Sequence, residues 1–292
     1  MITVRVPATA ANLGPGFDAC GLALDWYDEM SVEQIDGDHR AEVTGEGADE
    51  VPTDASHLVI KSILQGLDSL QSRVSGVLLR THNTIPHGRG LGSSAAAIVG
   101  GLALAHALAK PGVDLDRQWL LEQSAAAEGH PDNVAATVRG GFTIAWTDDA
   151  AATAVSLAPH PDLGVLALVP DHLLPTERAR SMLPSTVPHA DAAATAGRAA
   201  LLTHAVTTDP DLLLAATRDW LHQTQRGPAL GESYSLLTEL RREGWAAVVS
   251  GAGPTVLVLG RHEALRDLAG RRFHRHRAHL HVPGSGVRVR TG

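Results

Sequence analysis

The sequence has a single cysteine, few aromatic residues and no excess of basic charge. Cys20 is the one cysteine among 292 residues, which excludes an intrachain disulfide and a zinc site built from cysteines. The formal net charge at pH 7 is −8, because 32 Asp and Glu residues outnumber 24 Lys and Arg residues. Proteins that bind duplex nucleic acid present a basic face, so we expect no nucleic-acid partner.

Long hydrophobic runs are also missing. No apolar stretch reaches the roughly 20 residues that a membrane span needs, so we expect no membrane association. Ile2–Val6 alternates like a strand, without a charged and then apolar leader, which predicts a cytoplasmic protein. The one strongly basic stretch is Arg271–His281 (RRFHRHRAHLH), which we interpret as a solvated helix or sheet edge rather than a patch that binds nucleic acid.

Small apolar residues dominate what the sequence does contain. Hydrophobic residues make up 44% and charged residues 19% of the chain, which is ordinary for a globular protein. Strand and helix patterns follow one another without regular βαβ alternation, which predicts an α+β fold rather than a doubly wound sheet. Thr147–Pro161 is polar and rich in small residues, so we predict two domains, 1–150 and 151–292.

Periodicity predicts the positions of many helices and strands. Ser94–Ala109 is apolar on nearly every face, so we expect this helix to be buried on all sides. Other helices are expected at 57–70, 115–127, 190–206 and 211–222. Strands are expected at 2–6, 22–36, 39–46, 74–81, 138–146, 163–169, 245–250 and 255–259.

The stretch Ile85–Gly100 (IPHGRGLGSSAAAIVG) places a glycine cluster directly before that apolar helix. It lacks the lysine of a Walker P-loop, and Gly88, Gly90 and Gly92 lack the spacing of the dinucleotide fingerprint. Alternating glycines can turn successive amides inward as an anion nest, and the helix that follows adds its positive end. The alternative is a glycine-rich turn with Ser93 as the N-cap of the helix.

Two further glycine loops accompany this stretch, Pro7–Leu24 (PATAANLGPGFDACGLAL) and Ser250–Val256 (SGAGPTV). In this order the three resemble the signature motifs of the GHMP kinases, named for galactokinase, homoserine kinase, mevalonate kinase and phosphomevalonate kinase. Glu128–Phe142 (EGHPDNVAATVRGGF) and Pro175–Pro184 (PTERARSMLP) are similar to segments of the homoserine kinase branch. The resemblance extends from residue 4 to residue 259.

The resemblance implies the two-domain GHMP kinase fold, with a ribosomal-protein-like N-terminal α/β domain and a ferredoxin-like C-terminal domain. ATP would then phosphorylate the side-chain hydroxyl of L-homoserine in the cleft between the domains, a step of threonine biosynthesis. Mg²⁺ would be held by Ser94 and Glu122 from neighbouring helices, although Glu122 alone looks like a plain helix-surface residue. The ATP-phosphate loop would comprise Pro86, Gly88, Arg89, Gly90, Leu91, Gly92, Ser93, Ser94, Ala95 and Ala96.

The same resemblance assigns the substrate contacts. Guanidinium groups suit a carboxylate because they offer planar, bidentate donors, and Arg180 and Arg226 match the family positions for it. Asp18 matches the partner of the substrate ammonium group. The residues alone leave other interpretations open, since Arg180 could pair with Glu177 on a helix surface and Asp18 could close a turn. Further substrate contacts would come from Asn12, His130 and Asn133.

The catalytic set implied by the resemblance is Asn133, Arg180 and Asp132. Homoserine kinases are generally thought to lack a general base, which positioning and electrostatics can compensate in phosphoryl transfer. Asp132 could instead cap the helix that starts at Asn133. One departure is HQTQR at 222–226, where the family often has His-Glu-Pro-Tyr-Arg. A kinase for another small alcohol and a catalytically silent binding protein remain as alternatives, and we expect a homodimer.

Overall fold

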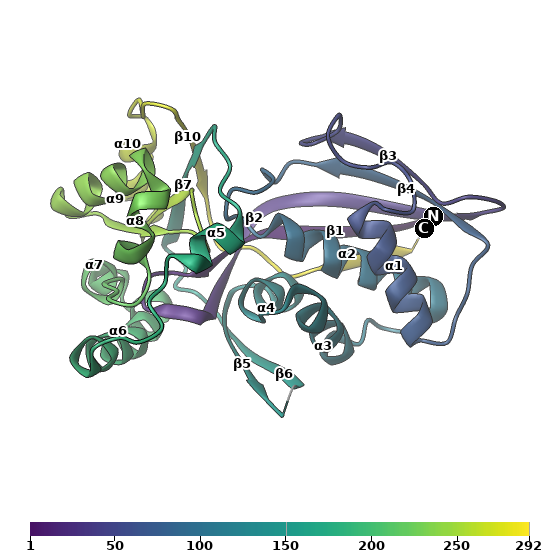
Figure 1. Cartoon of the computed structure of the whole chain (residues 1–292), viewed down its shortest axis with the longest axis horizontal. Helices are drawn as coiled ribbons and strands as arrows, with labels where there is room; N and C mark the ends of the chain where they lie inside the picture. Colours follow the sequence, from purple (N-terminus) through teal and green to yellow (C-terminus); the bar gives the residue numbers. More distant parts are fainter. Residues whose placement is uncertain (150, 292) are drawn as a thin grey trace.

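The computed structural model describes residues 1–149 and 151–291, which form two lobes side by side along the longest axis of the molecule (Figure 1). Within the described residues, the larger lobe is built on a seven-stranded sheet in the order β11-β1-β2-β4-β3, with β5 paired to β2 and to β6. Among the described strands of this sheet, β3 and β4 pair in parallel and the other pairs are antiparallel. The strands are β1 (Ile2–Asn12), β2 (Gly16–Ile35), β3 (Arg40–Gly45), β4 (Gly76–Asn83), β5 (Phe142–Asp148), β6 (Ala151–Leu157) and β11 (Arg288–Thr291).

Helices α2 (Ser93–Ala109), α3 (Arg117–Glu128) and α4 (Asp132–Arg139) pack against this sheet, and α1 (Leu58–Ser69) packs against α2. The predicted burial of the apolar helix is confirmed, because α2 is buried along nearly its whole length between α1, β1 and α3. Its small residues allow this close packing. A Cβ at Gly101 would lie 2.6 Å from the carbonyl oxygen of Val59 in α1, so a larger residue would push the two helices apart.

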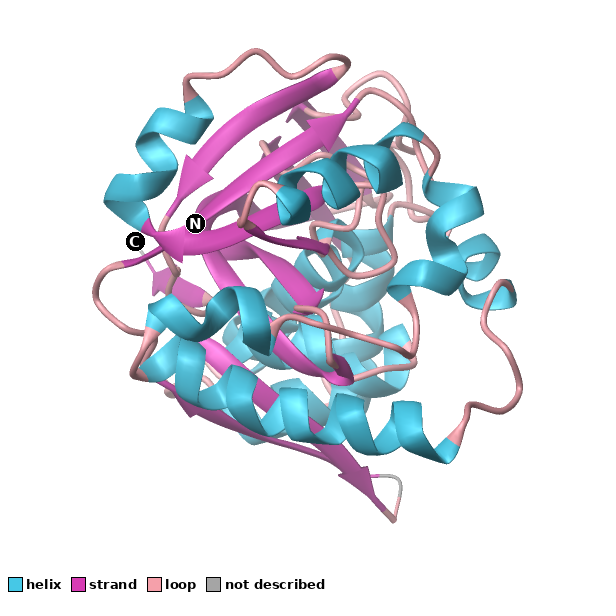
Figure 2. Ribbon diagram, turned by 90° about the vertical axis from the view of Figure 1, so that its left-hand side faces the viewer, coloured by secondary structure: helices cyan, strands magenta, loops and turns pink. Residues whose placement is uncertain are grey.

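The smaller lobe holds a four-stranded sheet in the order β10-β7-β9-β8 (Figure 2). Its strands are β7 (Leu163–Pro170), β8 (Ala246–Val249), β9 (Val256–Arg261) and β10 (His276–His281). The central strand β7 is buried at every position, as expected for a run of apolar residues without alternation. The helical elements are α5 (Thr176–Ser181), α6 (His189–Thr207), η1 (Pro210–Leu212), α7 (Leu213–Ala216), α8 (Gln223–Leu230), α9 (Glu232–Arg242) and α10 (His262–Ala269).

The two-lobed α+β architecture is confirmed, but the predicted boundary between 150 and 151 is wrong. Strand β6 pairs with β5 over seven residues, so it belongs to the larger sheet rather than to the second domain. The chain also returns to the larger lobe at its C-terminal end, where β11 pairs with β1. Small residues such as those of AATAVSL in β6 give little hydrophobic alternation, which is why this strand resembled a linker.

Two other predictions need correction or refinement. The helix expected at 211–222 is broken, because the carboxylate of Asp219 accepts hydrogen bonds from the backbone N–H groups of Leu221, His222 and Gln223 and thereby starts α8. The basic stretch contains the sheet edge that we expected, since β10 is an outer strand of the smaller sheet. No helix among the residues that the structure describes is long and apolar enough to cross a membrane.

Candidate functional site

The three glycine loops meet where the two lobes join. The first loop (12–16) links β1 to β2, the second (86–92) leads from β4 into α2, and the third (250–253) links β8 to β9. Ser250 Oγ donates to the carbonyl oxygen of Gly90 at 2.6 Å, and Gly251 N–H donates to that of Ala11 at 3.1 Å. Asn12 Nδ2 donates in turn to the carbonyl oxygen of Gly251 at 2.9 Å. Segments far apart in the sequence are therefore held together by direct hydrogen bonds.

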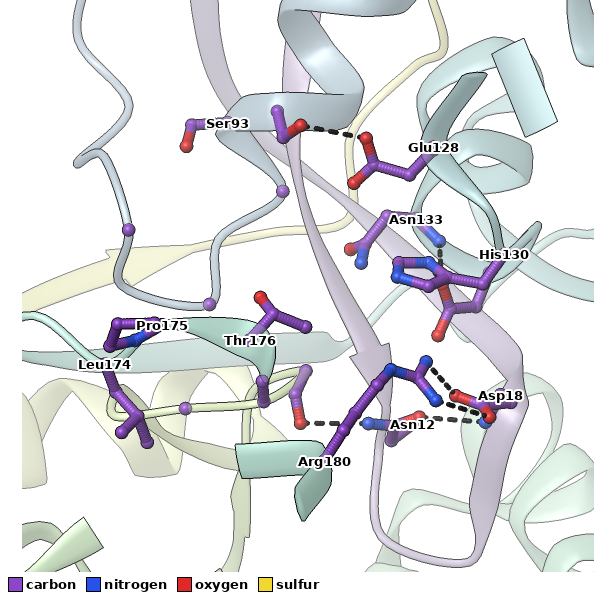
Figure 3. A pocket seen from close by; sticks show the side chains of 18 of the residues that line it. Asn12, Asp18, Ser93, Glu128, His130, Asn133, Leu174, Pro175, Thr176 and Arg180 are labelled. Atoms are coloured by element: carbon purple, nitrogen blue, oxygen red, sulfur yellow. Dashed lines mark hydrogen bonds and ion pairs between the residues drawn. The ribbon is translucent and has the colours of Figure 1, made fainter. Parts of the chain in front are cut away.

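A pocket of about 180 Å³ opens between these loops (Figure 3). Backbone of the second and third glycine loops forms one wall, and charged side chains from β2, α3, α4, α5 and α8 form the rest. The lining residues are Asn12, Asp18, Gly88, Gly90, Gly92, Ser93, Ser94, Glu128, His130, Asp132, Asn133, Leu174, Pro175, Thr176, Arg180, Arg226, Gly251, Ala252 and Gly253.

The second loop has the backbone of an anion nest. Gly88, Gly90 and Gly92 have φ angles of 63°, 75° and 69°, a left-handed conformation that other residues rarely adopt. Gly92 is itself the N-cap of α2 and no side chain caps this end, so the interpretation of Ser93 as the N-cap is wrong. The first N–H groups of α2 therefore have no intrahelical or side-chain acceptor, and they face the loop with the positive end of the helix dipole.

Some predicted loop residues support the loop without lining the pocket. Leu91, Ala95 and Ala96 are buried in the core of the larger lobe, and Pro86 lies outside the pocket as well. The guanidinium of Arg89 donates to the carbonyl oxygens of Pro170, Asp171 and His87. Its charge therefore ties the loop to the end of β7 instead of pointing at a phosphate.

The hydroxyl of Ser94 is paired with Glu128, not with Glu122. Ser94 Oγ donates to Glu128 Oε2 at 2.8 Å, at the end of the pocket next to α2 (Figure 3). Glu122 is exposed, lies outside the pocket and accepts a hydrogen bond from Gln118 on its own helix. Both glutamates belong to α3, but only the last residue of the helix reaches Ser94. The predicted pairing of Ser94 with Glu122 is therefore contradicted by the geometry.

Glu128 is an unusual carboxylate because of where it lies. It is partly buried at the C-terminal end of α3, where the helix dipole disfavours a negative charge. Burial raises the pKa of this carboxyl group above its ordinary value, and the hydrogen bond from Ser94 and the nearby His130 only partly oppose that effect. Among the described residues no lysine or arginine pairs with it. A carboxylate held in this way favours a cation as its partner.

At the opposite end of the pocket Arg180 forms a bidentate ion pair with Asp18. Nη2 lies 2.8 Å from Oδ1 and Nη1 lies 3.2 Å from Oδ2, so the predicted alternative pairing of Arg180 with Glu177 is not found. This hydrogen-bonded partner raises the pKa of Arg180. Asp18 has φ of 53°, and its N–H donates to Asn12 Oδ1 at 2.9 Å. A non-glycine residue in this conformation at a charged cleft is typical of functional sites.

The second predicted arginine, Arg226, is almost completely buried, with 1% of its surface exposed. Its Nη1 donates to the carbonyl oxygen of Gly251 at 3.1 Å, and its guanidinium carbon lies 5.3 Å from the ring centre of Phe17. Burial and the neighbouring Arg180 lower its pKa. No carboxylate forms an ion pair with Arg226 among the described residues, although a buried charge is usually paired.

Between these two ends His130, Asp132 and Asn133 also line the pocket. Asp132 Oδ1 accepts a hydrogen bond from the N–H of Asn133 at 2.7 Å and lies 3.2 Å from His130 Nδ1. The adjacent carboxylate of Asp132 raises the pKa of His130. Thr9 Oγ1 donates to Asn133 Oδ1 at 2.9 Å, which leaves the Nδ2 amide of Asn133 as the group available to a ligand.

Several residues of the pocket were not predicted from the sequence. Leu174, Pro175 and Thr176 come from the segment before and at the start of α5, and Gly251–Gly253 contributes backbone from the third loop. The sequence contained a signal for both segments, because Pro175–Pro184 and Ser250–Val256 were already recognised as motifs. Glu128 was also accessible to sequence reasoning, since it is the first residue of the EGHPDN motif.

A second, more apolar pocket of about 300 Å³ adjoins the first at Ser93 and Ser94. Its walls come from β2, the segment before α1 and the first turns of α2. They are lined by Asp28, Met30, Val51, Pro52, Ser56, His57, Leu58, Val59, Asn83, His87 and Ala97.

Two family models match the chain. The GHMP kinases N terminal domain covers residues 57–141, and the GHMP kinases C terminal domain covers residues 199–279. The N-terminal match thus includes the second glycine loop and the EGHPDN motif, and the C-terminal match includes Arg226 and the third loop.

Individual proteins match over almost the whole length. The chain is 49% identical over 289 residues to the homoserine kinase of Cutibacterium acnes, covering 98% of each sequence. It is 47% identical over 291 residues to the homoserine kinase of Streptomyces avermitilis, covering 98% of this chain and 95% of that one. The crystal structure of homoserine kinase from Cytophaga hutchinsonii aligns with a TM-score of 0.84 at 26% identity, over 99% of this chain and 96% of the other. These similarities extend over both lobes.

Proposed function

Because the chain belongs to the GHMP kinases and, among them, to the homoserine kinases, we propose that it transfers the γ-phosphoryl group of ATP to the side-chain hydroxyl of L-homoserine. The products are ADP and O-phospho-L-homoserine. One observation carries this proposal: a glycine loop with the backbone of an anion nest shares a pocket of about 180 Å³ with Asp18, Arg180 and Arg226. A phosphate donor and a charged amino-acid acceptor therefore fit side by side.

ATP spans the two adjoining pockets in this proposal. The apolar pocket takes the base, since it is lined by Met30, Val51 and Ala97 and has the size of a flat ring system. The phosphates lie against the second glycine loop and the N-terminus of α2, where N–H groups and the helix dipole favour negative charge. Ser93 and Ser94 line both pockets, so they mark the point where the phosphates leave the nucleoside.

The groups beside the loop suit Mg²⁺. Ser94 and Glu128 offer one hydroxyl and one carboxylate oxygen 2.8 Å apart, both hard donors of the kind that Mg²⁺ prefers. No cluster of three or more His, Cys, Asp or Glu side chains that could hold a metal occurs in the described part of the chain. A sparse protein set is what Mg²⁺ uses when phosphate oxygens and waters complete its shell. When bound, Mg²⁺ neutralises charge on the phosphates.

Homoserine is a zwitterion, and the other end of the pocket is complementary to it. Asp18 takes the ammonium group, and Arg180 and Arg226 take the carboxylate. In the absence of substrate Asp18 and Arg180 neutralise each other. Because the substrate carries both signs of charge, it can insert into this ion pair and leave each side chain with a partner of opposite charge.

Phosphoryl transfer then requires little covalent chemistry from the protein. Asp132 is engaged by the N–H of Asn133 and by His130, so we propose that it holds the start of α4 rather than acting as a general base. Asn133, held by Thr9, directs its amide N–H toward the reacting oxygens. Positioning of the hydroxyl in line with the γ-phosphate and stabilisation of its charge supply the catalysis.

A coupled ADP-release assay over homoserine, threonine, mevalonate and shikimate tests the proposal. We expect homoserine to give the highest kcat/KM by far. Higher activity with another alcohol would favour a related kinase of the same family, and nucleotide binding without any turnover would favour a silent binding protein. The place of the reaction in threonine biosynthesis, a cytoplasmic location and a homodimer stay predictions from the family resemblance.

A further inference from the structure

The contacts of a histidine that lies behind the pocket determine which of its ring nitrogens carries the proton. His222 is fully buried, immediately precedes α8 and does not line the pocket. Its Nε2 lies 2.8 Å from the carbonyl oxygen of Gly14, and its Nδ1 lies 3.0 Å from Nη1 of Arg226. A carbonyl oxygen only accepts and a guanidinium only donates. Nε2 therefore carries the proton, Nδ1 is an acceptor, and the ring is neutral.

We infer that His222 is a positioning residue for the substrate carboxylate: its neutral Nε2–H tautomer fixes the guanidinium of Arg226 in the orientation that faces the pocket. This inference rests on the proposed function, in which Arg226 binds that carboxylate. Nη1 of Arg226 is shared between His222 and the carbonyl oxygen of Gly251, and Nε donates to that of Ala179. Among the described residues Nη2 makes no hydrogen bond, so it is the group left for the ligand.

The surroundings of His222 hold the ring in this arrangement. Phe17 stacks on it with the ring centres 5.0 Å apart, and Phe17 also covers the guanidinium of Arg226. Asp219 Oδ2 lies 3.6 Å from Nε2, but this carboxylate is already occupied by three N–H groups at the start of α8. The departure from the common family pattern lies between His222 and Arg226, and it leaves both ends of this contact in place.

The charged groups around His222 determine what a second proton would do. Arg226 on α8, Asp219 before α8 and Asp18 on β2 are the titratable side chains that face it. Burial is the main effect that lowers the pKa of His222, and Arg226 lowers it further, whereas Asp219 and Asp18 raise it. Protonation at Nδ1 would aim an N–H at Nη1 of Arg226, so the contact would become repulsive and the arginine would turn away.

The test compares His222→Leu and His222→Gln, with His276→Gln as the matched control. His276 is another buried histidine of the smaller lobe, hydrogen-bonded to Ser233 and outside the pocket. Loss of a hydrogen bond to a charged group should raise the KM for homoserine about tenfold to hundredfold in His222→Leu. The kcat should change much less, because the carboxylate is bound equally in ground and transition states. Glutamine retains a donor and an acceptor and should recover part of the loss, while His276→Gln should match the wild type.

The pH profile provides an independent readout. The KM for homoserine of the wild type should rise as the pH falls below the ordinary range for histidine, and this rise should be missing in His222→Leu. Equal acid-side profiles of the two proteins would overturn the inference. If His222→Leu does not fold, His222→Gln serves in its place. Glutamine does not titrate either, so the rise in KM at low pH should be missing in that variant as well.

A double-mutant cycle with Arg226→Ala separates this inference from the proposed function. If His222 acts through Arg226, the double variant should lose little more than Arg226→Ala alone. Additive losses, or a wild-type KM in His222→Leu beside a raised KM in Arg226→Ala, would overturn the role of His222 only. An unchanged KM for homoserine in Arg226→Ala would overturn the carboxylate assignment itself, and the role of His222 with it.

Discussion

Glu128→Gln removes one negative charge from the α2 end of the pocket while it preserves the size of the side chain. Ser94 Oγ can still donate to the amide oxygen, so the local hydrogen bond of 2.8 Å can persist. The charged oxygen that we propose as a ligand for Mg²⁺ is lost. We expect kcat to fall at least about tenfold, which corresponds to about 1.4 kcal/mol of barrier. The Mg²⁺ concentration that gives half-maximal rate should rise by a similar factor.

The thermal stability of Glu128→Gln should not fall with its rate, but should stay equal or increase. Burial raises the pKa of Glu128 above the ordinary value of 4.5, so the folded state binds the proton more tightly than the unfolded state. The contribution of this group to stability is therefore full below pH 4.5 and is lost as the pH rises through the raised pKa. At pH values above that raised pKa, and without Mg²⁺, the folded enzyme bears a charged, partly buried carboxylate. Its neutral amide replacement should leave the melting temperature equal or higher.

Glu122→Gln is the matched control, since it makes the same chemical change on the same helix. Glu122 is exposed and contacts only Gln118 by hydrogen bonding among the described residues, so rate and Mg²⁺ dependence should stay within about twofold of the wild type. The measurements are a Mg²⁺ titration of the coupled ADP-release rate and a thermal melt. A wild-type Mg²⁺ dependence in Glu128→Gln would refute the metal assignment, and a tenfold loss in Glu122→Gln would refute the choice between the two glutamates.

Two other changes address the substrate and the phosphate loop. Arg180→Ala should lower kcat/KM for homoserine about tenfold to hundredfold, because a hydrogen bond to a charged group contributes about 1.5–3 kcal/mol, and Arg180→Lys should recover only part. If Arg180→Ala lost as much kcat/KM with 3-amino-1-propanol, which has no carboxylate, as with homoserine, the assignment of Arg180 to the carboxylate would be contradicted. Gly90→Ala should weaken ATP binding in calorimetry, because φ is 75° and a Cβ would lie 2.8 Å from the carbonyl oxygen of Gly253. Gly112→Ala has nearly the same φ, 76°, with no atom within 4 Å of its Cβ, so it should lose stability but keep its ATP affinity; equal ATP affinity in the two variants would contradict the role of the loop.

Local patterns were sufficient for the elements that carry the glycine loops. The apolar run of α2, the alternation in β1 and the glycine spacing before α2 are all properties of short segments, and the structure reproduces them. Short elements with weak patterns were not predictable in this way. β11 has four residues and pairs with β1 from the other end of the chain, so its place depends on a contact that no local window contains.

The correction of Glu122 to Glu128 as the partner of Ser94 shows a second reason why the site could not be predicted fully from the sequence. The two residues are six positions apart on α3, so they point to different sides of the helix. Which side faces Ser94 is decided by the packing of α3 against α2 and α4, which is a tertiary property. Likewise, the pairing of Arg180 with Asp18 joins residues 162 positions apart, and it displaces the local partner Glu177 that spacing within a helix suggests.

The charges at the proposed substrate end are the reason why we expect a zwitterion to fit best. Arg180, Arg226 and Asp18 lie there, with Asp132 close by, so two positive and two negative groups share a partly buried region of the pocket. A zwitterion adds one charge of each sign and leaves the sum unchanged, so every desolvated charge keeps a partner. An alcohol without charges would exclude water from Arg226 and give it no anion, and an amine without a carboxylate would add a cation beside two arginines. Because an unpaired buried charge costs far more than a lost apolar contact, discrimination among small alcohols should come from the carboxylate and ammonium groups rather than from the shape of the carbon chain.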